Sequence, residues 1–213
     1  MDELGVQASS LLQANGVIWV EGPSDRIYIK RWIELLAPDL EEHRHYSFFW
    51  YGGKNISHFS VEDPMSDQTA SDLIKALHVN RNSYVVCDRD RPNSTAPLKS
   101  AVDRVRSECV QSHAGFWLAD GIEIENYLSD QVIREVLEAS GRMGVQFKNK
   151  PFTQFHSSLD SACVNAGASA LKYSAKKVEW ARKFAEIYAK DDIRGTLKVQ
   201  VESLITAIRR WNA

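Results

Sequence analysis

The segment at residues 17–26 constrains the fold of this chain more than any other stretch. Residues 17–20 are an uninterrupted run of β-branched and aromatic side chains, which is typical of a strand buried on both faces of a parallel sheet. Glu21 follows this run, and Gly22 and Pro23 then mark a turn into a helix, because proline is favoured in the first helical turn. The segment therefore predicts a strand that ends on a carboxylate and leads directly into a helix.

Strands and helices alternate through the first 130 residues. Further short strands are expected at residues 46–51, 84–87 and 116–119, with helical segments between them. This alternation is typical of a doubly wound α/β unit with a mostly parallel sheet. We therefore predict an α/β catalytic core over residues 1–130, with a Rossmann-like sheet flanked by helices.

The last third of the sequence has a different character. Apolar residues recur at helical spacing in residues 132–137, 178–188 and 197–211, whereas the stretch from about 142 to 172 has a less regular pattern. We predict that residues 131–213 form a C-terminal helical addition that packs on the core and completes the active site. A short helix at residues 2–14 and short helices within the polar stretch 56–78 are also expected.

Composition excludes several classes of protein. The 213 residues are 44% hydrophobic, which is enough for a substantial core. A net charge of −2 gives no global signal for nucleic acid, so any polyanion must be bound by a local patch or through metal ions. Three irregularly spaced cysteines suit neither a disulfide framework nor a zinc site. We find neither a signal peptide nor a membrane span, and we expect a cytoplasmic protein.

Carboxylates follow three of the four predicted strands. Functional groups in an open parallel sheet gather at the carboxyl ends of the strands, so these acids are expected at one edge. Acids on one rim repel each other unless a cation compensates them, and Mg²⁺ or Mn²⁺ prefers such oxygen ligands. Two ions roughly 3.5–4 Å apart would suit phosphodiester cleavage. The acids are Glu21, Asp25, Asp88, Asp90, Glu123 and Glu125.

Each acidic motif also has a simpler explanation when it is taken alone. Ser24 or Asp25 could serve only as a helix-capping residue. The Asp-x-Asp at residues 88–90 could be a solvated turn, and the Glu-x-Glu at residues 123–125 could be the wet face of a strand edge. The joint placement of the three motifs at strand ends is what favours a functional site.

Together these residues resemble a TOPRIM domain, the metal-binding α/β module shared by type IA topoisomerases, bacterial primases and several nucleases. The TOPRIM pattern is a Glu-Gly-x-x-Asp turn after the first strand, here residues 21–25, and an Asp-x-Asp after the third, here residues 88–90. Tyr-Gly-Gly-Lys at 51–54 and Glu-Ile-Glu-Asn-Tyr-Leu at 123–128 narrow the resemblance to the TOPRIM region of OLD-family (overcoming lysogenization defect) nucleases. The resemblance covers residues 1–130 and extends into the C-terminal helices.

The resemblance implies a DNA endonuclease that depends on Mg²⁺ or Mn²⁺, uses two metal ions, and binds them through the six acids named above. We expect Glu21 to act also as a catalytic ligand or proton acceptor. The family uses a lysine from the C-terminal helices to neutralise the scissile phosphate, and the pair Lys176 and Lys177 is the candidate, with Lys177 preferred. Two lysines at the start of a helix are, however, usually solvated.

Two departures from the family pattern matter. Pro92 replaces the third acid that topoisomerases and primases carry in the Asp-x-Asp motif, which favours the nuclease branch. Full OLD proteins also have an N-terminal ABC-type ATPase domain, whereas this chain has no Gly-x-x-x-x-Gly-Lys-Ser/Thr phosphate loop. We therefore expect an excised C-terminal region without an ATP site.

Basic residues near the acids are candidates for DNA binding. Lys54 follows two glycines at the end of the second strand, where it could meet a phosphate or be an ordinary loop lysine. Arg89 and Arg91 could pair with the acids or contact DNA. Arg91, Lys54 and Lys176 are the predicted DNA-binding residues.

Two other functions stay open at this stage. The first is a non-catalytic, metal-stabilised TOPRIM module that binds nucleic acid or a partner protein. The second is a phospho-receiver-like signalling domain, which also places acids at parallel strand ends. Such a domain needs a lysine after a fifth strand, and no fifth strand is expected.

Overall fold

The structure is a computed structural model that describes residues 15–51, 65–80 and 82–213. Within these ranges four parallel strands form one sheet in the order β2-β1-β3-β4. The first strand lies between the second and the third, as in flavodoxin-like doubly wound folds, so the predicted fold class is confirmed. The strands are β1 (Val17–Val20), β2 (Ser47–Trp50), β3 (Ser83–Cys87) and β4 (Gly115–Leu118).

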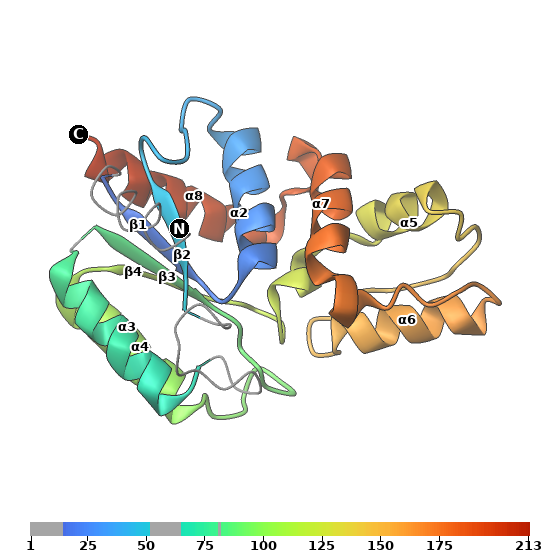
Figure 1. Ribbon diagram of the computed structural model, residues 1–213, viewed down its shortest axis with the longest axis horizontal. Coiled ribbons are helices and arrows are strands. Elements are labelled where there is room, and N and C mark those ends of the chain that lie inside the picture. Colours follow the sequence, from blue (N-terminus) through green and yellow to red (C-terminus); the bar gives the residue numbers. More distant parts are fainter. Residues whose placement is uncertain (1–14, 52–64, 81) are drawn as a thin grey trace, which may run out of the picture.

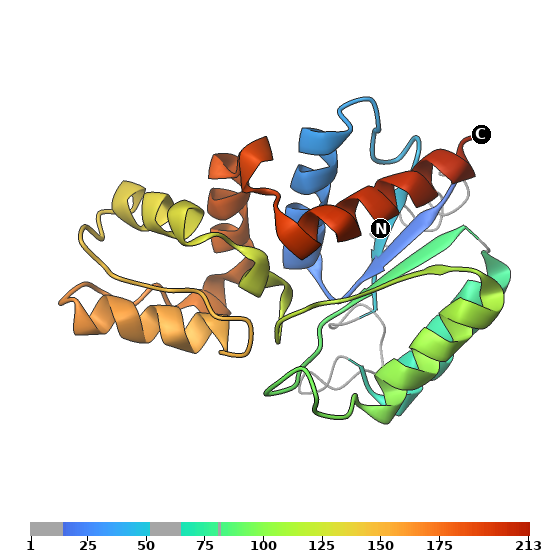
Figure 2. The same ribbon diagram turned by 180° about the vertical axis from the view of Figure 1, so that it is seen from behind.

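Two helices cover each face of the sheet (Figures 1 and 2). Side chains alternate along β1, where Ile18 and Val20 join the core under α2 and α8, and Val17 and Trp19 join the core under α3 and α4. All four positions are buried, which explains the uninterrupted apolar run in the sequence. The helices are α2 (Pro23–Leu36), α3 (Asp67–Val79), α4 (Ser100–Ser112) and α8 (Gly195–Trp211).

The C-terminal helix α8 returns to the amino end of β1. A Cβ atom at Gly16 would lie 1.9 Å from a ring carbon of Trp211, so only glycine fits beneath the indole. Asn15 Nδ2 donates a hydrogen bond to Asn212 Oδ1 at 2.8 Å. The helix α8 thus belongs to the layer that covers the sheet, and the predicted boundary at residue 130 stays a prediction.

Three helices form a group at one end of the molecule, beside α2 (Figures 1 and 2). Within this group α7 packs along both α2 and α5. The group lies within residues 131–213, the predicted helical addition, whereas α8 in the same range covers the sheet. Its helices are α5 (Asp130–Ala139), α6 (Phe155–Asn165) and α7 (Lys177–Ile187), and the 3₁₀ turns nearby are η1 (Ile124–Tyr127), η2 (Tyr173–Lys176) and η3 (Lys190–Asp192).

The helix α6 was not predicted from the sequence. It buries Phe155, Leu159 and Cys163 at intervals of four residues. Serine, histidine and aspartate separate these positions, and such residues compete with the helix for backbone hydrogen bonds or lose rotamer freedom in it. The apolar pattern in this stretch is therefore too sparse to predict a helix.

In the described part of the stretch 56–78, α3 is a single helix of 13 residues, and residues 56–64 lie outside the described residues. The Ser66 side chain accepts a hydrogen bond from the Thr69 N–H at 3.1 Å and starts the helix there. The helix expected at residues 2–14 lies outside the described residues. No helix in the described ranges is both long and apolar enough to cross a bilayer.

Candidate functional site

The carboxyl end of β1 carries Glu21 and leads into α2. Gly22 precedes the helix and Pro23 occupies its first turn, as predicted. The carboxylate of Asp25 accepts hydrogen bonds from the Gly22 N–H at 2.9 Å and from the Ser24 hydroxyl at 3.2 Å. Asp25 is only 4% exposed. It closes the first turn of α2, so the capping role that the sequence left open for it is present.

Glu125 lies in η1, just beyond β4, and is fully buried. Its Oε1 accepts a hydrogen bond from the Tyr173 hydroxyl at 3.1 Å and lies 3.3 Å from Lys177 Nζ. The hydroxyl of Tyr28, on α2, lies 3.0 Å from that of Tyr173. Glu125 Oε2 is buried and has no hydrogen-bond partner among the described residues. One oxygen of this carboxylate is therefore engaged, and the other is open to a ligand.

Glu123 ties the loop after β4 to the start of α6. Its Oε1 accepts a hydrogen bond from the Phe155 N–H at 2.7 Å. The side chain of Asn126 accepts one from the Glu123 N–H at 3.0 Å and donates to the Thr153 carbonyl at 3.1 Å. Glu123 is thus a helix-capping residue as well as a candidate ligand.

The two aspartates after β3 lie in different surroundings. Asp88 is half-buried, whereas Asp90 is exposed and has a positive φ of 50°. The Asp90 N–H donates to the Ile122 carbonyl at 2.9 Å, and its Oδ2 lies 3.2 Å from Lys99 Nζ. Asp90 therefore lies at the outer rim of the site and already has a cationic partner.

The two candidate lysines at the start of α7 also differ. Lys177 pairs with an acid, and its side chain is 33% exposed. Burial lowers the pKa of Lys177, but the surrounding carboxylates outweigh this effect and hold the pKa well above its ordinary value. Lys176 is exposed and lies 3.4 Å from Glu179. The carboxylates around Lys177 belong to Glu125, Asp25, Asp88 and Glu123.

Burial and mutual repulsion raise the pKa values of the acids. Burial, with a contribution from neighbouring carboxylates, raises the pKa of Glu21 to about 8 and that of Glu123 to about 7. The pKa values of Asp25 and Asp88 are also raised, by burial first. The Lys177 ammonium opposes the shift in all four cases. The acids therefore share one electrostatic environment.

The donor chemistry of this environment fits a hard divalent cation. All the donors are carboxylate oxygens, and a cation would relieve both their repulsion and the open Glu125 Oε2. Within the described ranges, however, no group of three or more His, Cys, Asp or Glu side chains is arranged so that it could hold an ion. The predicted ligand set stays a prediction, and acid side chains would have to turn toward an ion to bind it.

The other predicted basic residues are less informative. Lys54 lies outside the described residues. Arg91 is half-buried, and its Nε has no hydrogen-bond partner in the described part of the chain. Arg89 donates through Nε to the Ala119 carbonyl at 3.1 Å, so this nitrogen binds the backbone and not an acid.

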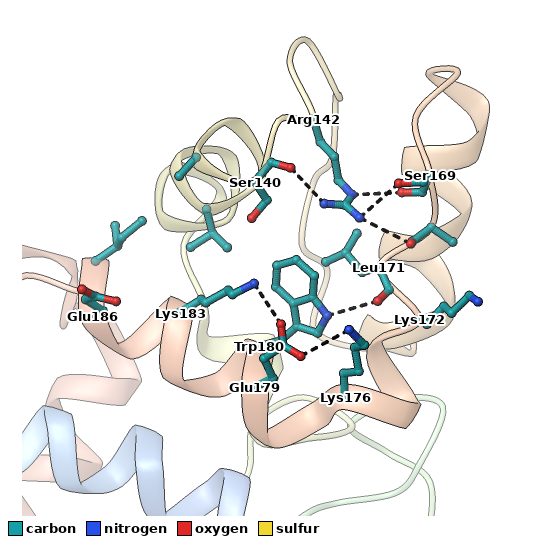
Figure 3. Close-up of a pocket in the computed structure, with 14 residues that line it drawn as sticks. Ser140, Arg142, Ser169, Leu171, Lys172, Lys176, Glu179, Trp180, Lys183 and Glu186 are labelled. Atoms are coloured by element: carbon teal, nitrogen blue, oxygen red, sulfur yellow. Dashed lines mark hydrogen bonds and ion pairs between the residues drawn. The ribbon is translucent and has the colours of Figure 1, made fainter.

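A cavity of about 860 Å³ lies between α5, α7 and residues 169–172 (Figure 3). Trp180 forms part of its wall, with the Lys183 ammonium 4.3 Å from the ring centre. Arg142 donates hydrogen bonds to backbone carbonyls on both sides of the cavity. Of the predicted site residues, Lys176 alone lines this cavity. The cavity and the acids are therefore separate regions.

Tyr173 and Lys99, which contact acids, and Tyr28, which contacts Tyr173, were not identified as site residues from the sequence. Tyr28 has the spacing of an apolar helix position, and its hydroxyl is the signal that could have pointed to a buried polar partner. Tyr173 lies just after a stretch without regular pattern, and Lys99 just before α4, so neither gives a comparable signal.

No family model matches the sequence, and no curated protein is significantly similar to it. The structure is similar to the C-terminal region of the Burkholderia pseudomallei OLD protein, with a TM-score of 0.53 and 16% identity over 92% of this chain and 98% of that chain. It is also similar to the C-terminal region of the Xanthomonas campestris pv. campestris OLD protein, with a TM-score of 0.52 and 14% identity over 94% and 98%. At these identities the likeness shows the fold, which is the TOPRIM-type fold of OLD C-terminal regions.

Proposed function

We propose that this chain is the catalytic region of a divalent-metal-dependent DNA endonuclease of the OLD type. The observation that carries the proposal is Glu125, a fully buried carboxylate with one engaged oxygen and one oxygen without a partner. Strongly perturbed, buried ionisable groups gather at functional sites, and Glu125 lies among several such acids. The fold shared with OLD C-terminal regions supports the proposal.

The acids would hold Mg²⁺ or Mn²⁺, and two such ions would activate the attacking water and stabilise the leaving oxygen. Glu21 is the acid that we propose as a ligand or as the acceptor of a proton from the attacking water. Asp25 and Glu123 also hold helix starts, so as ligands they would share their carboxylates between these hydrogen bonds and the ion. The proposed ligands are Glu21, Asp25, Asp88, Asp90, Glu123 and Glu125.

Lys177 is the group that we propose to neutralise the scissile phosphate. Its ammonium now compensates Glu125 at 3.3 Å. When cations take over this compensation, the ammonium can turn to a phosphate oxygen, where a charge-assisted hydrogen bond stabilises developing negative charge. We propose further DNA contacts for Lys54, Arg91 and Lys176.

Nicking of supercoiled plasmid in Mg²⁺ or Mn²⁺ tests this function. We expect Glu21→Ala and Asp88→Ala each to lower the nicking rate by at least about 10²–10³-fold, as for removal of a group that stabilises the transition state. Asp103→Ala is the matched control, because Asp103 is an exposed acid on α4 that pairs with Arg106. Wild-type nicking by both site variants would disprove the assignment.

The rival function is a metal-stabilised module that binds nucleic acid or a partner without cleaving it. The capping hydrogen bonds of Asp25 and Glu123 favour it, since they give two of the acids structural roles. A chain that binds DNA but never nicks plasmid, at any divalent metal concentration, would establish this function. The described sheet has four strands, so it lacks the fifth strand of a phospho-receiver-like domain.

A further inference from the structure

A chain of buried hydroxyl groups leads from α2 to the acids. Tyr28 and Tyr173 are fully buried or nearly so, and their hydroxyl oxygens are 3.0 Å apart. The Tyr173 hydroxyl donates its single hydrogen to Glu125 Oε1. The hydrogen between the two tyrosines must therefore come from Tyr28, because an O–H group has one hydrogen to donate. The hydrogen bonds run in one direction, from Tyr28 through Tyr173 to Glu125.

The direction of the hydrogen bonds from Tyr28 to Glu125 fixes the orientation of the Glu125 carboxylate. Oε1 receives two donors, the Tyr173 hydroxyl and the Lys177 ammonium. Oε2 receives none from the described residues, although it is buried. Lys177 is partly exposed and can move, whereas Tyr173 is held by the surrounding core. Tyr173 is thus the donor that holds Oε1 in place even when Lys177 moves, while Oε2 keeps no donor from the described residues.

Tyr28 links the Glu125 carboxylate to α2, the helix that follows β1. It lies three residues after Asp25 on α2, so both side chains lie on the same face of the helix. The hydroxyl chain therefore connects η1, which carries Glu125, with the helix that carries Asp25.

We propose that Tyr173 and Tyr28 are positioning residues, which orient Glu125 so that its Oε2 is available to a divalent cation. The proposal rests on the proposed metal site and extends it to two residues outside the acidic motifs. Tyr173 acts on the carboxylate directly, and Tyr28 acts through Tyr173. Outer partners of this kind change metal affinity about 10–100-fold when they are removed from other metal sites.

The test compares phenylalanine variants, which remove only the hydroxyl. Mn²⁺ binding to the full chain without DNA is measured by electron paramagnetic resonance, alongside the unfolding temperature. We expect Tyr173→Phe to weaken Mn²⁺ binding about 10-fold or more, Tyr28→Phe to weaken it less, and the double variant to match Tyr173→Phe. Tyr84→Phe is the control, since that buried tyrosine donates to Ser203 at 3.2 Å on α8.

The outcomes separate this proposal from the nuclease function. If Tyr173→Phe binds Mn²⁺ like wild type and loses only as much unfolding temperature as Tyr84→Phe, the hydroxyl is merely structural and the proposal is wrong. Independent, additive losses from Tyr28 and Tyr173 would also overturn it, as would a wild-type chain that binds no Mn²⁺. Weakened Mn²⁺ binding in a chain that nicks no DNA would support the positioning role and overturn only the nuclease function.

Discussion

Lys176 and Lys177 are adjacent in the sequence, yet they meet opposite environments at the start of α7. Lys177 lies among buried acids and is paired with Glu125. Lys176 lies at the cavity of Figure 3, where it shares Glu179 with Lys183 at distances of 3.4 and 3.0 Å. Both regions bring lysines to carboxylates, so residue type does not distinguish them.

Burial is what distinguishes the two regions. The side chain of Glu179 is 48% exposed, and water screens its pairs with both lysines. Glu125 has no exposed surface, and burial first, with a contribution from the Glu125 charge, raises the pKa values of Glu21 and Glu123. The comparison teaches that burial, and not residue type, decides how strongly an acid and a lysine interact here.

The largest difference is expected between two matched substitutions, Lys177→Met and Lys176→Met. Each removes an ammonium and keeps an aliphatic stem. Lys177→Met should lower plasmid nicking by about 10²–10³-fold, as for loss of a transition-state charge. It should also destabilise the metal-free chain by about 2–3 kcal/mol, below the usual value for a broken buried pair because the side chain is 33% exposed.

Lys176→Met should lower nicking by less than about fivefold, since it removes one proposed phosphate contact and a surface pair that contributes little. Plasmid nicking assays and thermal unfolding of the two purified variants measure the change in nicking rate and the change in stability. Equal losses of nicking in the two variants would mean that burial does not separate the lysines.

The unfolding temperature should depend on pH, and this effect of intermediate size should come only from the buried acids around Lys177. The folded pKa values of Glu21 and Glu123, about 8 and about 7, are above the ordinary value of 4.5. Their contribution to stability is therefore complete below pH 4.5 and is lost as the pH rises through 7 and 8. The metal-free chain should unfold roughly 5 °C lower at pH 8.5 than at pH 5.5.

Saturating Mg²⁺ should remove most of this decrease, because the cation replaces the protons. Thermal unfolding at the two pH values, with Mg²⁺ or with a chelator, makes the comparison. Glu21→Gln should reduce the dependence of the metal-free unfolding temperature on pH. A metal-free chain that is more stable at pH 8.5 would contradict the expected sign.

The smallest effect is expected at the cavity. Glu179→Gln removes the acceptor charge of both surface pairs, so the unfolding temperature should change by no more than about 1 °C. Its pH dependence should match that of the wild type between pH 5.5 and 8.5. A loss of nicking comparable to that of Lys177→Met would show that the cavity takes part in the reaction.

The strands and the acidic motifs could be predicted from the sequence because each follows from local patterns. The apolar run of β1 and the acids after β1, β3 and β4 are readable from residue order. Pro23 at the start of α2 is equally local. Elements with sparse apolar residues, such as α6, were missed because their burial depends on partners far along the chain.

The contacts between distant segments could not be predicted in the same way. Tyr28 and Tyr173 are separated by 145 residues, and their hydrogen bond exists only because α7 and η2 pack beside α2. The preference for Lys177 over Lys176 came from resemblance to a family and not from the residues themselves. The 3₁₀ turn η2 leads into α7 and decides which of the two lysines faces the acids. No sequence pattern specifies that turn.

The hydrogen bond between Asn15 and Asn212 has a consequence for the architecture of any larger protein built around this fold. It places both ends of the described fold at the amino ends of the strands, whereas the acids lie at the carboxyl ends. A segment joined at Asn15 or Asn212 would therefore leave the described fold on the side away from the acids. Adjacent ends also suit circular permutation, so the order in which the elements are synthesised can be changed while the acids keep their neighbours.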